Sequence, residues 1–180
     1  GLYREHPVGT FLLPALLAGR MDNSLCNKLV ATELFWSVAD DLGTALAHVS
    51  FGEDLLALFA LVCRAERFAH VPDPLYRYLR RPTGVTLTED ASVLAGNVES
   101  LGRVFDVVRA TLARRSEPPA LVHAFFEREF VGPVVDHLWR ARERGTGAPA
   151  GLPASPAPLG LLGALVARGV FEDDVPAGGT

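Results

Sequence analysis

Residues 50–66 read SFGEDLLALFALVCRAE, the clearest secondary-structure pattern in the chain. Apolar residues fill nearly every position after Asp54, and a helix that is apolar almost all round is a buried helix. Ser50 and Glu53 have the spacing of a capping box, the arrangement in which two side chains satisfy the free amides of a helix start. We therefore predict a buried helix over residues 53–66, with Glu53 and Asp54 in its first turn.

The chain before this helix alternates between short helical and irregular patterns. We predict a helix over residues 8–19, which Pro14 shortens or kinks. An irregular segment over 23–30 and a short helix over 32–40 follow, and residues 42–49 fit a helix or a strand equally well. After the buried helix, strands over 68–71 and 75–79 are expected on either side of a proline-rich turn.

A different pattern begins at residue 88, where two long amphipathic helices are expected. Apolar residues recur at spacings of four and three along the first helix, over 94–112, and form one stripe. The second helix covers 121–139 and bends at Gly132-Pro133. We predict that the two helices form an antiparallel hairpin that buries both stripes. The residues of the first stripe are Leu94, Val98, Leu101, Phe105, Val108 and Leu112.

The composition excludes several classes of protein. Apolar residues make up 49% and charged residues 21% of the chain, which is a globular balance. The net charge of −4 argues against a nucleic-acid binder, because that role needs a clustered basic footprint. Cys26, Cys63 and the scattered histidines have no metal-ligand spacing, so we expect the chain to hold no metal itself. The longest apolar runs fall short of the roughly 20 residues that span a bilayer.

Several short motifs follow one another in a fixed order between residues 8 and 88. They are Asn-Lys-Leu at 27–29, Glu-Leu-Phe at 33–35, Gly-Glu-Asp-Leu-Leu at 52–56, Arg-Ala at 64–65, Pro-Leu-Tyr-Arg-Tyr at 74–78, Arg81 and Thr86. This order and spacing resemble the C-terminal, acceptor-side part of family-2, GT-A type glycosyltransferases. The chain departs from the family pattern at Cys26, Val30 and Leu79, where the family commonly has an aromatic residue, a Tyr or Phe, and an Arg.

The resemblance implies a role for five residues. Asp54 would be the general base that takes the proton from an acceptor hydroxyl, and Glu53 would orient it. Asn27 and Lys28 would bind substrate at the floor of the site. Arg81 would approach the donor diphosphate and neutralise charge on the departing nucleotide. Tyr76 and Tyr78, in the same pattern, are expected to be packed strand residues.

The whole enzyme would then transfer a sugar from a nucleotide-sugar donor to a hydroxyl acceptor. By resemblance the transfer proceeds with inversion and serves the synthesis of a surface polymer or glycoconjugate, in the cytoplasm or at the membrane periphery. The complete enzyme would use Mg or Mn, bound at an Asp-x-Asp motif that these 180 residues lack. We expect the chain to be a fragment whose N-terminal nucleotide-binding half is missing, and to be inactive alone.

The fold class that follows is α+β and helix-rich: a partial GT-A glycosyltransferase domain followed by a helical hairpin. Residues 1–87 would be the acceptor-side portion of that domain and 88–143 the hairpin extension. A flexible linker over 144–158, rich in Gly, Ala and Pro, and a short terminal helix and tail over 159–180 complete the chain.

One alternative from another class is a non-catalytic helical interaction or regulatory module, in which Glu53 and Asp54 are only a helix start. A homo-oligomer is compatible with either interpretation. Whether Asp54 and Arg81 line a common cleft separates the two, because a general base must face its substrate.

Overall fold

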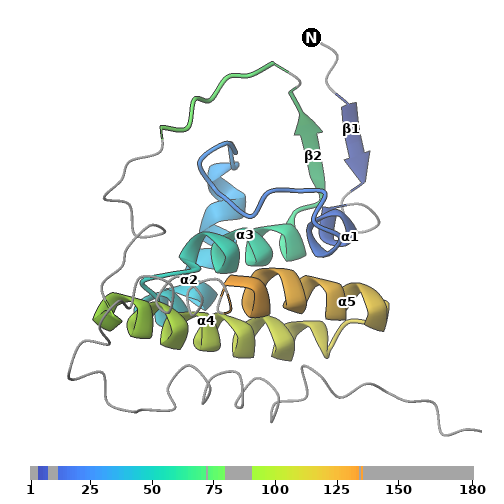
Figure 1. The fold of residues 1–180 in the computed structure, drawn as a ribbon. Helices are drawn as coiled ribbons and strands as arrows, with labels where there is room; N and C mark the ends of the chain where they lie inside the picture. The colour runs from blue at the N-terminus through green and yellow to red at the C-terminus, as the bar shows by residue number, and fades with distance from the viewer. Residues whose placement is uncertain (1–3, 8–11, 72, 80–90, 134, 136–180) are drawn as a thin grey trace, which may run out of the picture.

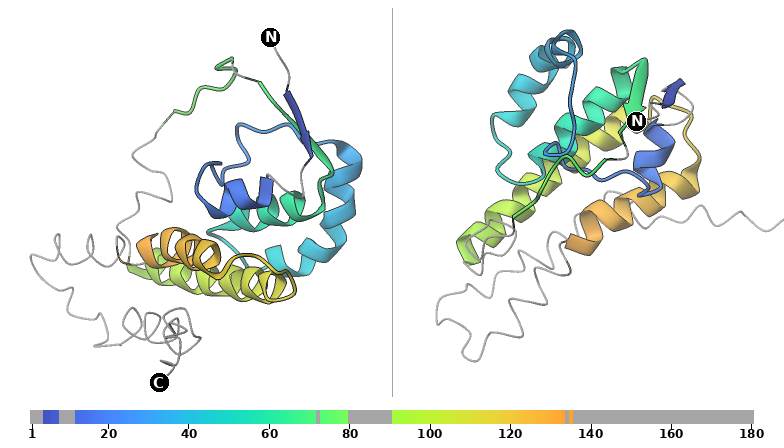
Figure 2. Two further views of the ribbon diagram at one scale, coloured as in Figure 1. Left: turned by 90° about the vertical axis from the view of Figure 1, so that its right-hand side faces the viewer. Right: turned by 90° about the horizontal axis from the view of Figure 1, so that it is seen from above.

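The computed structural model describes residues 4–7, 12–71, 73–79, 91–133 and 135. This part of the protein is helix-rich (Figure 1). Its elements, in order, are β1 (Arg4–Pro7), α1 (Leu12–Leu17), α2 (Thr32–Leu46), α3 (Glu53–Arg64), β2 (Arg67–His70), α4 (Ala91–Leu112), α5 (Pro119–Phe126) and the π-helical turn η2 (Glu127–Val131). Helices α4 and α5 lie side by side as one layer beneath α1 and α3, and α2 flanks α3 (Figure 2).

One hydrophobic core joins these layers. Four phenylalanine rings form its centre, and the ring centroids of Phe105 and Phe126 lie 4.7 Å apart. Phe105 also meets Phe130 edge-on at 5.2 Å, while Phe125 reaches Phe59 of α3 at 6.4 Å. The same core includes Leu16 of α1. It therefore crosses the boundary that we predicted between residues 87 and 88.

The helix α3 confirms the buried element expected from its apolar run, but the expected capping box is wrong. The N-cap residue is Gly52, with φ +84°, and no side chain among the described residues caps the helix. Ser50 lies two residues before the cap, and its Oγ is 3.1 Å from Ser100 Oγ on α4. Because the chain enters the helix through a left-handed glycine, Ser50 cannot reach the first amides, and Glu53 stands at the first helical position.

Helix α2 is longer than the sequence pattern indicated. We expected a helix over 32–40 and left 42–49 open, whereas one helix runs from Thr32 to Leu46. Val38 and Leu42 are both buried, four residues apart on one face, and Leu46 packs against the same core. The packing of this stripe resolves the ambiguity in favour of a helix.

The strand pairing differs from the hairpin that we predicted. β2 forms close to the expected position, but its partner is β1, antiparallel, with Arg4 opposite His70. The expected strand over 75–79 is wrong, because residues 73–79 have no regular structure. Proline rings at positions 72 and 74 remove two backbone donors from this segment, which disfavours a ladder. Tyr76 and Tyr78, expected to pack in that strand, are instead exposed.

The two C-terminal helices run antiparallel, as the hairpin prediction required (Figure 1). The stripe of α4 is buried from Leu101 to Leu112, and Val98 is partly buried; the side chain of Leu94 lies outside the described residues. The second helix begins at Pro119, passes through η2 and is still helical at Gly132. Its remainder beyond residue 135, the linker over 144–158 and the terminal segment 159–180 also lie outside the described residues.

Candidate functional site

Asp54, the predicted general base, lies in the first turn of α3 beneath the loop of residues 21–30, which we call the site loop. The backbone amide of Leu25 donates to Asp54 Oδ2 at 3.3 Å, and Ser24 Oγ donates to the same oxygen at 3.4 Å. Asp54 is half-buried in this arrangement. Its carboxylate therefore has a structural role: it receives donors from the site loop, 29 and 30 residues away in the chain.

Hydrogen bonds within the site loop fix its shape. Asp22 Oδ1 accepts from the amide of Ser24 at 3.0 Å, which is an Asx turn, and its Oδ2 accepts from Asn27 Nδ2 at 3.4 Å. The amide of Cys26 donates to Ser24 Oγ at 3.2 Å. Lys28 Nζ donates to the carbonyl of Ser24 and, at 2.7 Å, to Asn27 Oδ1. Both predicted substrate-binding residues, Asn27 and Lys28, thus belong to one polar network.

Lys28 is the only lysine of the 180-residue sequence, among 17 lysines and arginines in all. Burial lowers its pKa from the ordinary value of 10.5, and the nearby Asp22, Asp54 and Cys26 oppose that shift. The dominance of burial means that its ammonium is less hydrated than that of a surface lysine. It is a donor that already has two acceptors in the loop.

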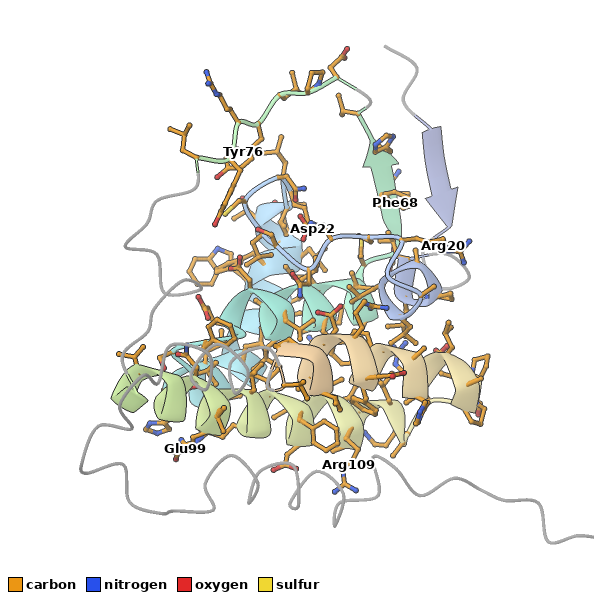
Figure 3. The ribbon with its side chains drawn as sticks, viewed as in Figure 1. Arg20, Asp22, Phe68, Tyr76, Glu99 and Arg109 are labelled. Atoms are coloured by element: carbon orange, nitrogen blue, oxygen red, sulfur yellow. The ribbon has the colours of Figure 1, made fainter. Side chains whose placement is uncertain are left out.

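The site loop is also touched by the segment that carries the Pro-Leu-Tyr-Arg-Tyr motif (Figure 3). The side chains of Tyr76 and Cys26 interact, and their hydrogen bond is the main reason why the pKa of Tyr76 is raised. Residues 26 and 76 stand in two separate motifs of the sequence. The structure brings these motifs together at the loop that covers Asp54.

The structure thus unites Asp54, Asn27 and Lys28, but it assigns the two acids differently from our expectation. We expected Glu53 to take the structural role and Asp54 to be free to face a substrate. Asp54 instead fastens the site loop, while Glu53 is exposed and makes no hydrogen bond or ion pair with the part of the chain that the structure describes. Arg81 lies outside the described residues.

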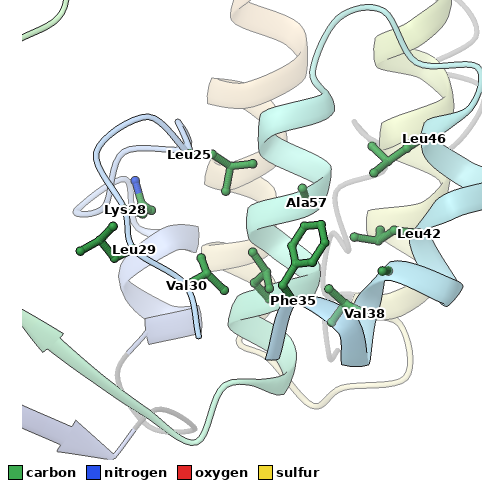
Figure 4. A pocket seen from close by; sticks show the side chains of 11 residues that line it. Leu25, Lys28, Leu29, Val30, Phe35, Val38, Leu42, Leu46 and Ala57 are labelled. Atoms are coloured by element: carbon green, nitrogen blue, oxygen red, sulfur yellow. The ribbon is translucent and has the colours of Figure 1, made fainter. Parts of the chain in front are cut away.

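A cavity of about 360 Å³ opens between the site loop, α2 and α3 (Figure 4). Its walls are apolar apart from Lys28, and they include Leu25, Phe35 and Leu61. Asp54 is not among its lining residues. The cavity suits an apolar group, so it does not supply the common cleft that would place a substrate beside Asp54.

Large apolar side chains are exposed in two segments, residues 29–36 and 71–79, which we call together the apolar face. Leu29 is fully exposed and Trp36 is 64% exposed, although both would favour an apolar environment. Tyr76 of the second segment interacts with Cys26 in the site loop. The apolar face consists of Leu29, Val30, Phe35, Trp36, Val71, Leu75, Tyr76, Tyr78 and Leu79. Leu29, Val30 and Phe35 also line the cavity, and exposed apolar groups around a cavity are typical of a surface that contacts something else.

Sequence reasoning missed the residues that hold the other side of the site loop. Asn23 Nδ2 donates to Glu129 Oε2 of η2 at 2.6 Å, across 106 positions of sequence. Arg128 donates to the carbonyl oxygens of Leu16 and Leu17. The only sequence signal for these contacts was the run of charges Glu127, Arg128 and Glu129. Such a run is also typical of a solvent-exposed helix face, so it did not identify the contacts.

Two further features are absent from the described residues. No group of three or more His, Cys, Asp or Glu side chains there is arranged to hold a metal ion. None of the helices described combines the length and the apolar character that crossing a bilayer requires. No protein-family model, curated protein or solved structure matches this chain.

Proposed function

We propose that the chain is the acceptor-side part of a family-2, GT-A type glycosyltransferase. The whole enzyme would transfer a sugar from a nucleotide-sugar donor to a hydroxyl acceptor, with inversion, in surface polymer or glycoconjugate synthesis. One observation carries the proposal: three motifs that are separate in sequence meet at one loop. Asn27 and Lys28, Asp54, and Tyr76 all contact the site loop or belong to it.

The geometry of Asp54 is compatible with a base. Both hydrogen bonds that orient its carboxylate end on Oδ2, so a proton taken from an acceptor hydroxyl would go to Oδ1. Because hydrogen bonds to Oδ2 fix the carboxylate, Oδ1 is oriented before the acceptor binds. Acid–base catalysis needs such preorganisation. The charge of Asp54 opposes the lowering of the Lys28 pKa, so the ammonium and the carboxylate act on each other within one site.

The apolar face supports the second part of the proposal, a nucleotide-binding half packed against this one. Leu29 of the site loop and Trp36 of α2 are exposed side chains that such a packing would bury. That half would supply the donor site and the residues for Mg or Mn. We place the assembled enzyme in the cytoplasm or at the membrane periphery, and a homo-oligomer stays compatible with this assignment.

A second candidate, the non-catalytic interaction module, is favoured by one observation. Asp54 accepts hydrogen bonds from its own chain and does not line the cavity, as expected of a residue whose role is structural. In that case the apolar face would bind a partner protein. The two candidates therefore differ in what Asp54 does, which mutation can test.

The test uses the gene that encodes this chain, with the coding sequence upstream of Gly1 included. The proposal requires an Asp-x-Asp motif after a parallel strand there, and metal-dependent transfer from a panel of sugar nucleotides by the encoded protein. Asp54→Asn should lower kcat by at least about 100-fold, the range expected for loss of a general base. The matched control is Glu53→Gln, one position away and exposed, which should cost less than about tenfold. Upstream sequence without the motif, or equal activity in the two variants, would select the interaction module.

A further inference from the structure

We propose that Glu129 and Arg128 of η2 are positioning residues, which clamp the site loop over Asp54 from the C-terminal hairpin. The clamp is a property of the fold. Its value for an enzyme rests on the proposed function, and its test below does not need activity.

Glu129 makes the stronger of the two attachments of the site loop. Its Oε2 accepts from Asn23 Nδ2 at 2.6 Å, and its side chain is only 13% exposed. The bonds from Leu25 and Ser24 to Asp54 measure 3.3 and 3.4 Å, at the weak end of the hydrogen-bond range. Both acceptors are carboxylates, so the shorter distance and the low exposure of Glu129 identify the bond from Asn23 as the stronger one. The loop thus depends more on the C-terminal hairpin than on α3.

Arg128 joins Glu129 to the end of α1, the helix that precedes the site loop. Its Nε donates to Glu129 Oε1 at 2.6 Å. The same guanidinium donates to the carbonyl oxygens of Leu16 at 2.9 Å and Leu17 at 3.2 Å, the last residues of α1. The carbonyls at a helix C-terminus need donors from outside the helix. The Leu16 carbonyl also accepts from the amide of Gly19 at 3.0 Å, so the guanidinium is a second donor there. One side chain therefore joins the end of α1 to η2.

The backbone beside the clamp is shaped to admit it. Gly19, just after α1, has φ +69°, and a Cβ built there would lie 2.7 Å from an Arg128 nitrogen. The Arg128 guanidinium also lies 5.6 Å from the centre of the Phe125 ring, which presents its face to the cation. A larger residue at position 19 would displace the guanidinium from its carbonyl partners.

The π-helical turn accounts for the direction of these side chains. Phe130 stays in the core, 1% exposed, while its neighbour Glu129 reaches the site loop. A π turn widens the helix by one residue and redirects the side chains in it, and such turns are often found at functional sites. η2 therefore lets one helix serve the core and the loop at once.

The single lysine of the sequence gives a direct readout of the loop. In protein labelled with [ζ-15N]lysine, Lys28 gives the only side-chain lysine signal, and its shift against pH reports the pKa of the amine. A second readout is hydrogen exchange at the amide of Leu25, which the bond to Asp54 protects. The variants are Glu129→Ala and Glu129→Gln, with Glu99→Ala as control, because Glu99 forms an exposed ion pair with Arg103 on α4.

We expect Glu129→Ala to raise the pKa of Lys28 toward 10.5, because a released loop hydrates its amine. Simple loss of a negative charge would lower that pKa, so the direction identifies the clamp. Exchange at Leu25 should accelerate about tenfold, as for loss of one strong hydrogen bond. Glu129→Gln keeps an acceptor for Asn23 and should lie closer to the wild type. Glu99→Ala should change neither readout.

If Glu129→Ala does not fold, Asn23→Ala removes the same bond from the other side, and the same two changes are expected. A melting temperature that falls in Glu129→Ala or Asn23→Ala, with the pKa of Lys28 and the exchange of Leu25 unchanged, would overturn the clamp. That outcome leaves the activity test on Asp54 untouched, so the two proposals fail separately.

Discussion

Replacing Gly52 by alanine should destabilise the protein, although the same change at two other glycines should stabilise it. Gly52 is the N-cap of α3 and has φ +84° and ψ 9°, the left-handed conformation that side chains with a Cβ disfavour. A Cβ at this position would lie 3.2 Å from Leu101 Cδ2 and 3.5 Å from Val104 Cγ2. Both neighbours are buried core residues of α4, so neither can move freely.

The magnitude follows from three terms. The left-handed conformation costs an alanine roughly 1–2 kcal/mol. The tight contact with Leu101 adds about 1 kcal/mol, at the low end of overpacking in a core. The smaller entropy of the unfolded alanine chain returns about 0.4–1 kcal/mol. The net loss in the free energy of unfolding for Gly52→Ala is therefore about 1–3 kcal/mol.

Gly43 in α2 and Gly96 in α4 are the matched controls. Neither has a positive φ, and a Cβ added at either would meet none of the described atoms within 4 Å. Alanine is the better helix former, so Gly43→Ala and Gly96→Ala should each stabilise the protein by about 0.5–1 kcal/mol. The same substitution should thus lower the free energy of unfolding at Gly52 and raise it at Gly43 and Gly96.

Urea unfolding followed by far-ultraviolet circular dichroism measures all four proteins, with the free energy extrapolated to water. The reasoning is refuted if Gly52→Ala is as stable as the wild type. It is equally refuted if the two controls fall as far as Gly52→Ala, because the loss would then come from alanine itself and not from the backbone of the helix start.

Three further predictions follow from the core, the site loop and the sequence. Phe105→Ala should cost about 3–5 kcal/mol of unfolding free energy, because the ring is fully buried, whereas Phe35→Ala, at a side chain that is 50% exposed, should cost far less; urea unfolding compares them. The lowered pKa of Lys28 means that the unfolded chain binds more protons just below pH 10.5, so this residue's contribution to stability rises with pH through that window, and Lys28→Met should abolish the rise in a pH series of unfolding measurements. The 180-residue chain alone should turn over no sugar nucleotide, and nucleotide release above the rate of a chain-free control would contradict this.

The helices were predictable where apolar residues recur in the sequence at helical spacing. The apolar run of α3 and the stripe of α4 are each recorded at helical spacing, and both are buried. The start of α3 was not predictable. Ser50 and Glu53 have the spacing of a capping box, but Gly52 adopts a left-handed backbone conformation that residue spacing does not reveal. Likewise β1 is four residues with a proline and no alternation, so nothing local identified it as the partner of β2.

The candidate site was predictable in part. The motifs containing Lys28 and Asp54 were selected by resemblance, and they do meet. The roles of Glu53 and Asp54 were not predictable, because the Leu25 amide that binds Asp54 belongs to a loop without regular structure. The bond between Asn23 and Glu129 joins positions 106 residues apart, and no pattern within one chain segment contains such a pair.

That separation has a consequence for the order of events during synthesis. A ribosome adds about 5–20 residues each second, so the 106 residues between Asn23 and Glu129 take about 5–20 s to make. Throughout that interval the N-terminal loop has left the ribosome without the carboxylate that fastens it. The nascent chain therefore completes this site only when its hairpin emerges. Until then Leu16, Leu17 and Phe59 lack their core partners in the C-terminal helices, and chaperones would have to shield these exposed side chains.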